Sequence, residues 1–147
     1  MKREAQHTAM YSIGEAAKKL DVSVQLLRLY EERGLIIIQK SDGNQRMYTD
    51  DDLERIRCIR EAINEQKISM EGIRRIHSLI PCWEMIHCPV KKRKDCPAYG
   101  SHKAGCWTYE HTNTDCALRD CRACKVYQYS SECKNIKPLI QRSLSTS

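Results

Sequence analysis

Apolar residues in the first half of the chain recur with the period of a helix. Between Ile13 and Leu20 they fall at i, i+3, i+4 and i+7, a spacing that places them on one helical face. Ser12 precedes this segment, and Glu15 follows three residues later, which is the pattern of a capping box. We therefore predict a helix that begins directly after Ser12.

A second helical stripe begins after a short break. Val24, Leu27 and Tyr30 share one face, Ser23 is suited to cap the start, and Gly34 is a typical stop. Two short helices joined by a tight turn form a helix-turn-helix, which we predict over residues 13–32.

The pattern then changes from helical to extended. Leu35–Gln39 is apolar and β-branched, residues 41–44 read Ser-Asp-Gly-Asn, and Arg46–Tyr48 can pair back as a second strand. This predicts a small hairpin, a wing, over residues 35–48.

Two more helices are predicted before the pattern ends at Pro81. Thr49 caps a helix from Asp50 to about Gln66, with three aspartates in the first turn, where the helix dipole favours negative charge. Ser69 caps a fourth helix. The residues expected to face inward are Leu53, Ile56, Ile59 or Arg60, Ile63, Ile73, Ile76, His77 and Ile80.

Taken in order, these segments resemble the winged-helix DNA-binding domain of MerR-type transcription regulators. The resemblance rests on the segments IGEAAKKLDVSVQLLRLYEERGL, RMYTDDDLERIRCI and ISMEGIRRIHSL. It covers about residues 11–80, and the residues LLRLYEERGL and GIRRI are closest to the HspR-like branch. It implies a mainly α fold with a small β-wing, and a regulator rather than an enzyme.

The resemblance also implies where DNA would bind. The second helix would enter the major groove, where Gln25 can read a base edge and Arg28 can reach guanine or phosphate. Arg46 and Tyr48 match the family's Arg-x-Tyr in the wing. Lys18 and Lys19 are plausible phosphate contacts, but they are equally ordinary solvated side chains. Tyr30 stands where the family has an aromatic that either contacts the DNA backbone or packs in the core. The candidate DNA-binding residues are Lys18, Lys19, Ser23, Gln25, Arg28, Tyr30, Arg46 and Tyr48.

The chain departs from the family pattern at two places. Met47 stands where many members have a second wing arginine. Pro81 and a run of cysteines occupy the place of the long dimerisation helix. A palindromic operator requires a two-fold protein, so we expect a homodimer whose contact comes from the C-terminal half.

Composition changes sharply near residue 80. Of nine cysteines, eight follow this point, and the net charge of +6 divides into +1 for residues 1–80 and +5 for residues 81–147. We predict a disordered tail at 1–10, a DNA-binding domain at 11–80, a cysteine-rich domain at 81–133 and a polar tail at 134–147. Mild basicity is compatible with a nucleic-acid partner.

The cysteines point to metal or redox chemistry. The chain has neither an apolar run of about 18 residues nor a signal core, so we expect a cytoplasmic protein without a membrane partner, in which thiols stay reduced. The candidate ligands are Cys82, Cys88, Cys96, Cys106, Cys116, Cys121 and Cys124, with Cys133 the weakest. Which four group together is left open.

Local motifs favour an iron–sulfur cluster over zinc. Cys88-Pro89 and Cys96-Pro97 resemble the Cys-Pro at the end of cluster-ligand runs. Only Cys121 and Cys124 have the two-residue spacing of a zinc finger, which His111 could complete. Stress-induced disulfides are a third interpretation. The segment 82–127 also resembles cysteine-rich modules with two Cys-Trp pairs.

The sequence thus predicts a MerR-like winged-helix domain followed by a small, loop-rich domain stabilised by a metal or cluster. We expect a transcription regulator that binds double-stranded DNA, with RNA polymerase as a further candidate partner. Loss or oxidation of the cofactor would shift the placement of the winged helices. One alternative makes the cysteine domain a permanent zinc staple. Another is an iron–sulfur redox protein that uses the winged helix for docking, which the lack of a catalytic motif disfavours.

Overall fold

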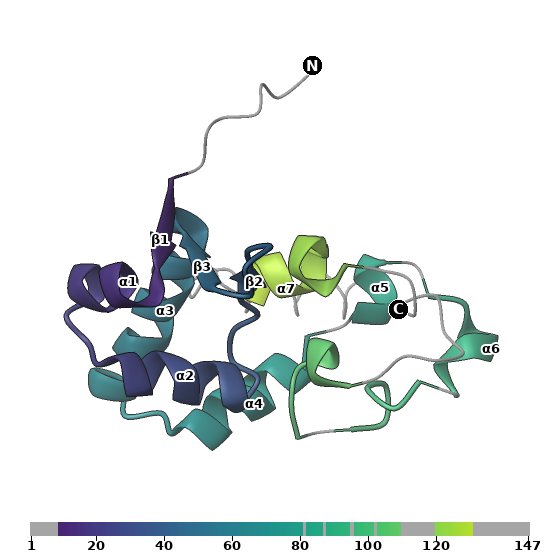
Figure 1. Cartoon of the computed structure of the whole chain (residues 1–147). Helices are drawn as coiled ribbons and strands as arrows, with labels where there is room; N and C mark the ends of the chain where they lie inside the picture. The colour runs from purple at the N-terminus through teal and green to yellow at the C-terminus, as the bar shows by residue number, and fades with distance from the viewer. Residues whose placement is uncertain are drawn as a thin grey trace, which may run out of the picture. The chain divides into compact units, whose positions relative to one another are not determined.

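The computed structural model describes residues 9–80, 82–86, 88–94, 96–101, 103–109 and 120–130 (Figure 1). These residues fall into two compact units, one that ends at Arg60 and one that begins at Glu61. Cys116, Cys133, the three histidines after residue 80 and the predicted tail 134–147 lie outside the described residues.

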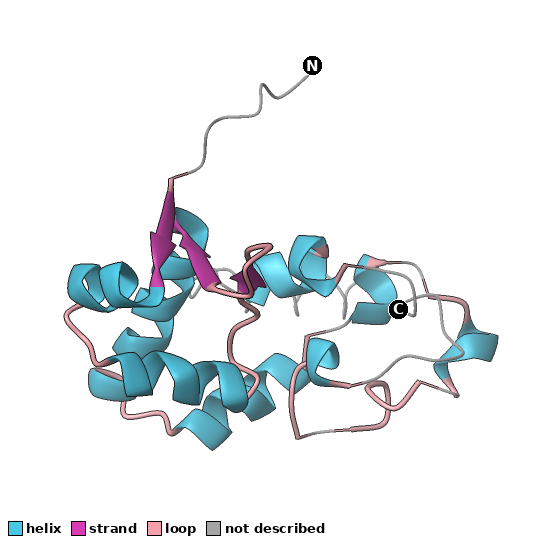
Figure 2. Ribbon diagram, in the orientation of Figure 1, coloured by secondary structure: helices cyan, strands magenta, loops and turns pink. Residues whose placement is uncertain are grey.

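The first unit consists of helices and one small sheet. Its helices are α1 (Ile13–Leu20), α2 (Val24–Glu32) and most of α3 (Asp50–Asn64). Its strands are β1 (Met10–Ser12), β2 (Gln39–Lys40) and β3 (Arg46–Thr49), in the antiparallel order β1-β3-β2 (Figure 2). A mainly α fold with a small β-wing is confirmed.

The helix boundaries follow their predicted caps. Ser12 Oγ accepts the Glu15 amide at 3.2 Å, while Glu15 Oε1 accepts the Ser12 amide at 3.4 Å. Ser23 Oγ accepts the Leu26 amide at 3.1 Å at the start of α2. Gly34 adopts a positive φ of 74°, which glycine permits without steric cost, and ends the segment of α2.

The sheet differs from the predicted hairpin. The strand expected at Leu35–Gln39 is reduced to Gln39–Lys40, because Leu35, Ile36 and Ile38 are buried in the core instead of pairing along the wing. β1, which was not predicted, pairs with β3 from Met10 to Ser12. Met10 was expected in a disordered tail, and its partner Thr49 lies far along the chain.

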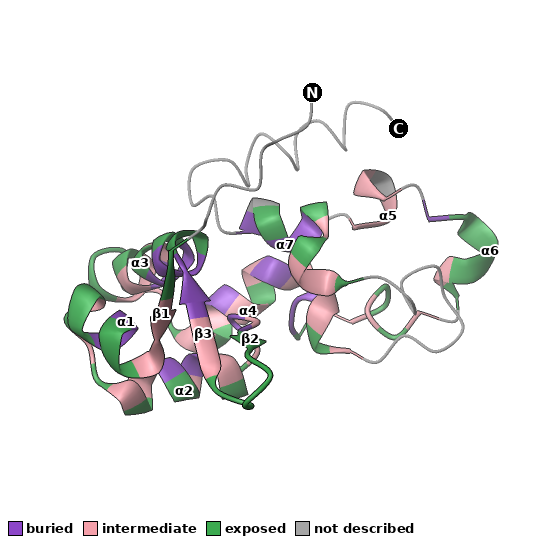
Figure 3. Ribbon diagram, turned by 45° about the horizontal axis from the view of Figure 1, so that its top comes forward, coloured by how far each residue is buried: buried purple, intermediate pink, exposed green. Residues whose placement is uncertain are grey.

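The core of the first unit lies between the helices and one face of the sheet (Figure 3). Arg55 of α3 is almost fully buried within it and donates its Nε–H to the Leu35 carbonyl at 2.9 Å. This hydrogen bond fixes the chain that leaves α2. The buried apolar side chains are Ala16, Ala17, Leu27, Tyr30, Leu35, Ile36, Ile38, Tyr48, Leu53, Ile56 and Ile59.

The second unit joins α4 to short elements of the cysteine-rich segment. Within the described residues these are α4 (Met70–Ser78), α5 (Cys82–Met85), α6 (Val90–Arg93), the 3-10 turns η1 (Cys106–Thr108) and η2 (Cys121–Ala123), and α7 (Lys125–Ser130). Its buried residues include Ile73, His77, Ile80, Ala104, Val126 and Tyr127. The described helices include none that is both long and apolar enough to cross a membrane.

Candidate DNA-binding surface and cysteine cluster

Helix α2 presents two polar side chains from its first turns. Gln25 and Arg28 are exposed and three residues apart, so they lie on neighbouring positions of one helix face. Ser23 is engaged in the cap of α2, where it fixes the point at which the helix begins. The arrangement can offer an amide and a guanidinium together to a nucleic-acid groove.

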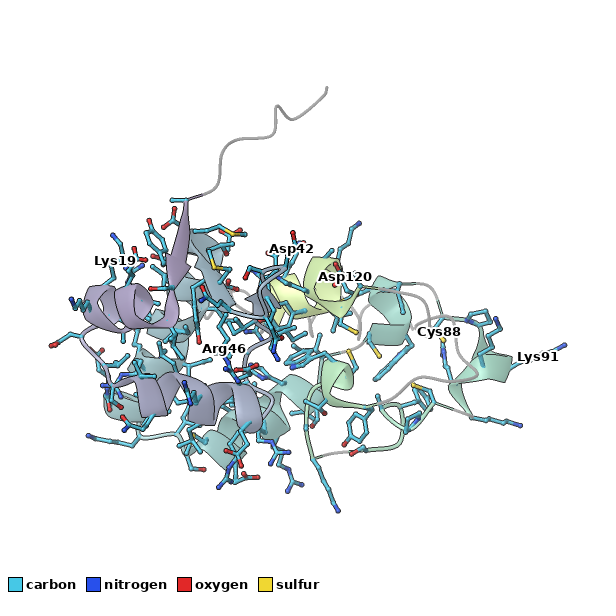
Figure 4. All side chains as sticks on the ribbon, in the orientation of Figure 1. Lys19, Asp42, Arg46, Cys88, Lys91 and Asp120 are labelled. Carbon is cyan, nitrogen blue, oxygen red and sulfur yellow. The ribbon has the colours of Figure 1, made fainter. Side chains whose placement is uncertain are left out.

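Basic side chains also lie at the end of α1. Lys18 and Lys19 are exposed in its last turn. The ammonium of Lys19 lies 4.7 Å from the centre of the Tyr11 ring, whose hydroxyl donates to Asp50 Oδ1 at 3.0 Å. This cation–π contact holds Lys19 beside β1 while leaving it accessible (Figure 4).

Arg46 connects the wing to α2. Its Nε donates to Glu31 Oε2 at 2.6 Å, and the Arg46 side chain remains 32% exposed. The hydrogen bond to Glu31 raises the pKa of Arg46, which stays a cation. Arg46 is therefore both anchored to α2 and open to a ligand (Figure 4).

Tyr30 and Tyr48 lie in the core and not on the surface. Tyr30 is 1% exposed and Tyr48 is 0% exposed. Burial raises the pKa of Tyr48 to about 12, with the negative charge of Glu31 adding to the effect. The structure thus differs from the expected contact between the Tyr48 side chain and the DNA backbone, because packing encloses its hydroxyl.

Four cysteines stand at the starts of short elements in the second unit. Cys82 begins α5, Cys106 begins η1, Cys121 begins η2 and Cys124 directly precedes α7. Both α5 and η2 contact α7. Trp107 of η1 lies edge-on to Tyr127 of α7, with ring centres 5.2 Å apart. Cys82 and Cys106 therefore lie on elements that pack against α7.

The electrostatics of these thiols show that they are neighbours. A hydrogen bond with Cys106 lowers the pKa of the Cys82 thiol to about 7, and the same bond raises the pKa of Cys106. The charges of Cys82, Cys124 and Cys121 raise the Cys106 pKa further. Burial, followed by the charge of Cys124, raises the pKa of Cys121.

The cluster is not a closed ligand set. In the part of the chain that the structure describes, no group of three or more His, Cys, Asp or Glu side chains has the arrangement that holds a metal ion. The donor chemistry of the four thiols nevertheless suits a soft metal, since thiolates are the ligands of zinc and of iron–sulfur clusters.

Two further candidate cysteines flank α6. Cys88 is buried, its Sγ lies 3.8 Å from the Pro89 carbonyl oxygen, and its own carbonyl accepts Arg93 Nε at 3.1 Å. Cys96 follows α6 and is half-buried. Figure 4 shows Cys88 and Lys91 on this α6 side of the unit.

Trp107 joins the cysteine cluster to α4. Its ring centre lies 5.1 Å from that of His77, at an angle of 57°. A Cβ at Gly105 would lie 2.5 Å from the Trp107 ring, so only glycine allows this packing. The other tryptophan, Trp83, packs on Tyr99 at 5.1 Å. The sequence indicated that His77 faces inward, but nothing in its pattern identified Trp107 as the partner.

Comparison with known protein families finds a match in the first half of the chain. The family described as "MerR HTH family regulatory protein" matches residues 11–79. Residues 11–79 form a MerR-type helix-turn-helix domain. The helices α1 to α4 lie within these residues, with α2 as the second helix of the motif (Figure 1).

Three similar proteins are regulators or stress proteins. The HTH-type transcriptional regulator ZntR of Escherichia coli is 37% identical over 71 residues, 48% of this chain and 50% of that protein. The HTH-type transcriptional regulator MlrA of Salmonella typhimurium is 40% identical over 57 residues, 38% of this chain and 24% of that protein.

The heat shock protein HspR of Streptomyces coelicolor is 32% identical over 72 residues, 49% of this chain and 48% of that protein. The chain therefore spans about half or less of the length of these relatives. No solved structure matches the chain.

Proposed function

We propose that this chain is a sequence-specific transcription regulator that binds double-stranded DNA. The observation that carries the proposal is the exposed pair Gln25 and Arg28 at the start of α2, within a domain of the MerR type. A recognition helix enters the major groove with its N-terminal residues against the base edges. A cytoplasmic location fits this role.

The surrounding side chains divide between phosphate contact and support. Lys18, Lys19 and Arg46 are accessible cations that can hold phosphates, a contact that carries no sequence information by itself. Tyr30 and Tyr48 support α2 and β3 from inside the core. Two such domains in a homodimer would read the half-sites of a palindrome, and RNA polymerase is a further candidate partner.

The cysteine-rich segment would hold a soft metal or an iron–sulfur cluster that regulates DNA binding. What supports this is the convergence of cysteines around α7 and the contact of Trp107 with His77 on α4. Helix α4 lies within the matched residues 11–79, so a change at the cluster would reach a helix of the matched segment. A permanent structural zinc site is the second candidate.

Replacement of Arg28 tests whether α2 is the recognition helix. In a gel-shift or fluorescence-anisotropy assay against promoter DNA, Arg28→Ala should lose about 1–3 kcal/mol of specific binding, because a bidentate arginine contact contributes that much discrimination. Arg57→Ala is the matched control, since Arg57 is an exposed arginine on α3 outside the helix-turn-helix. Equal binding by Arg28→Ala and wild type would refute the assignment of α2.

A further inference from the structure

We propose that α6 and the residue that follows it form a second DNA-binding surface, in which Lys91 and Lys94 contact the phosphates of double-stranded DNA. The inference rests on the proposed function and deepens it, because it adds a phosphate contact without sequence preference to the reading of bases by α2. The surface lies outside the residues that match the MerR-type family, in the cysteine-rich half of the chain.

The positive charge of the chain lies mostly outside the domain that matches the family. Residues 1–80 carry a net charge of +1, and residues 81–147 carry +5. The densest run of cations is 91–94, which reads Lys-Lys-Arg-Lys, and Asp95 offsets one of these charges in the sequence. Affinity for DNA increases with the number of phosphates that cations neutralise. A DNA-reading domain that is nearly neutral overall would therefore gain affinity from this run.

The backbone places two of these lysines on the same side of α6. Lys91 lies within the helix, and Lys94 is its C-cap, with helical φ and ψ of −60° and −35°. Residues three apart in such a backbone are neighbours, with Cβ atoms about 5–6 Å apart. Both side chains are exposed, and Figure 4 shows Lys91 extending away from α6. Two ammonium groups are thus presented together to one ligand.

Hydrogen bonds fix α6 at both of its ends. Pro89 is the N-cap residue, and its carbonyl accepts the Lys92 amide at 3.0 Å. The Nε–H of Arg93 donates to the Cys88 carbonyl at 3.1 Å, and the Arg93 carbonyl accepts the Cys96 amide at 3.2 Å. Arg93 is therefore the cation that holds the short helix in place. A helix that is already ordered loses less conformational entropy when its exposed lysines bind a ligand.

The composition of α6 favours a polyanion over an apolar partner. Val90 is its one apolar residue and is 68% exposed, and a single exposed valine is ordinary on a protein surface. Lysine ammonium groups bind phosphate oxygens as point charges and do not distinguish bases. Double-stranded DNA is the polyanion proposed for the MerR-type domain of the same chain. Linkage within one chain would raise the local concentration of DNA phosphates around α6.

The test measures binding of the full chain to fluorescent duplexes, one with the promoter sequence and one scrambled, at several salt concentrations. Lys91→Gln/Lys94→Gln should bind both duplexes about 10-fold or more weakly near 0.1 M salt, because two phosphate contacts are lost. The slope of log Kd against log salt concentration should decrease by roughly 1.8, at about 0.9 for each contact. The ratio of the two affinities should stay at the wild-type value, since phosphate contacts carry no sequence information.

Lys103→Gln/Lys125→Gln is the matched control. Both residues are exposed lysines of the second unit, so this variant loses the same charge outside α6. It should keep the wild-type slope. An unchanged slope for the α6 variant, or an equal decrease in both variants, would overturn the proposal. Circular dichroism of each variant checks that the helices are retained.

A second measurement uses the wild-type chain and so covers a variant that fails to fold. The chain is acetylated on lysine with and without duplex DNA, and mass spectrometry should show protection of Lys91 and Lys94 but not of Lys103 and Lys125. Absence of this protection, or stronger protection by single-stranded RNA or by vesicles of anionic lipid, would overturn the proposal. Arg28→Ala should lose affinity for the promoter duplex alone, whereas the α6 variant should lose it for both duplexes, so failure of either proposal is recognised separately.

Discussion

At the scale of single residues, the Arg-x-Tyr of the wing combines surface and core. Arg46 and Tyr48 are two residues apart on β3 and therefore share a face of the strand. Arg46 reaches Glu31 and remains partly exposed, while Tyr48 is enclosed. The sequence pattern could not separate these roles, because a tyrosine that supports a wing and one that touches DNA occupy the same position.

Replacement of Tyr48 by phenylalanine should leave stability unchanged or raise it by about 1 kcal/mol. The Tyr48 hydroxyl is buried, and within the described residues it has no hydrogen-bond partner, so its removal abolishes a desolvation cost. Urea unfolding at neutral pH measures the change. A loss of more than about 1 kcal/mol would show that the hydroxyl is bonded.

The same variant should alter the response to alkali. The pKa of Tyr48 is raised from its ordinary value of 10 to about 12, so the folded state retains a proton that the unfolded state loses. Stability from this group is complete below pH 10 and declines as the pH rises toward 12. Tyr48→Phe should therefore show a shallower loss of stability over that window than wild type.

At the scale of elements, the helices α1 to α4 and the strand β3 were predictable, whereas β1, the position of β2 and the short helices α5 to α7 were not. Ser12, Ser23 and Ser69 cap their helices through contacts within three residues, which a sequence displays directly. β1 and β2 form only by pairing with β3. Met10 of β1 pairs with Thr49, which lies much later in the sequence. An apolar run such as Leu35–Ile38 is compatible with either a strand or a buried connection.

The start of α3 is held by hydrogen bonds between Thr49 and Asp52. Asp52 Oδ2 accepts the Thr49 amide at 2.8 Å and the Thr49 hydroxyl at 3.1 Å, and Asp52 is 4% exposed. Asp52→Ala should cost about 1–3 kcal/mol, because the buried Thr49 amide and hydroxyl lose their acceptor and one half of the capping box is removed.

Asp51→Ala is the matched control for this substitution. Asp51 is exposed in the same first turn of α3 and contributes only through the helix dipole, so its loss should cost well under about 1 kcal/mol. Thermal unfolding of both variants gives the comparison. Similar losses in the two variants would argue against the hydrogen bonds from Thr49 to the Asp52 carboxylate.

At the scale of the whole molecule, α4 belongs both to the second unit, which holds the cysteines, and to the segment 11–79 that matches the MerR-type family. The spacing of the cysteines predicted a metal or cluster but could not group them, because only Cys121 and Cys124 are close in sequence. The Trp107–His77 contact was likewise invisible, since its partners belong to segments with different patterns. Through this contact, metal binding at the cysteines would affect α4.

This contact yields the last prediction. Removal of metal by a chelator should change the affinity of wild type for promoter DNA by about 5–150-fold, the usual range of allosteric coupling. In His77→Ala the change should fall below about 2-fold while zinc still binds, because Trp107 then has no ring on α4 to move. Fluorescence anisotropy with and without chelator measures both values.

Trp83→Ala provides the control for a general effect of losing an aromatic contact. Trp83 also follows a cysteine, but its ring packs on Tyr99 and not on α4, so this variant should keep the wild-type response to the chelator. A wild type that ignores the chelator would make the metal purely structural. A His77→Ala variant that responds like wild type would instead place the coupling in the dimer contact, since the route through α4 would then be dispensable.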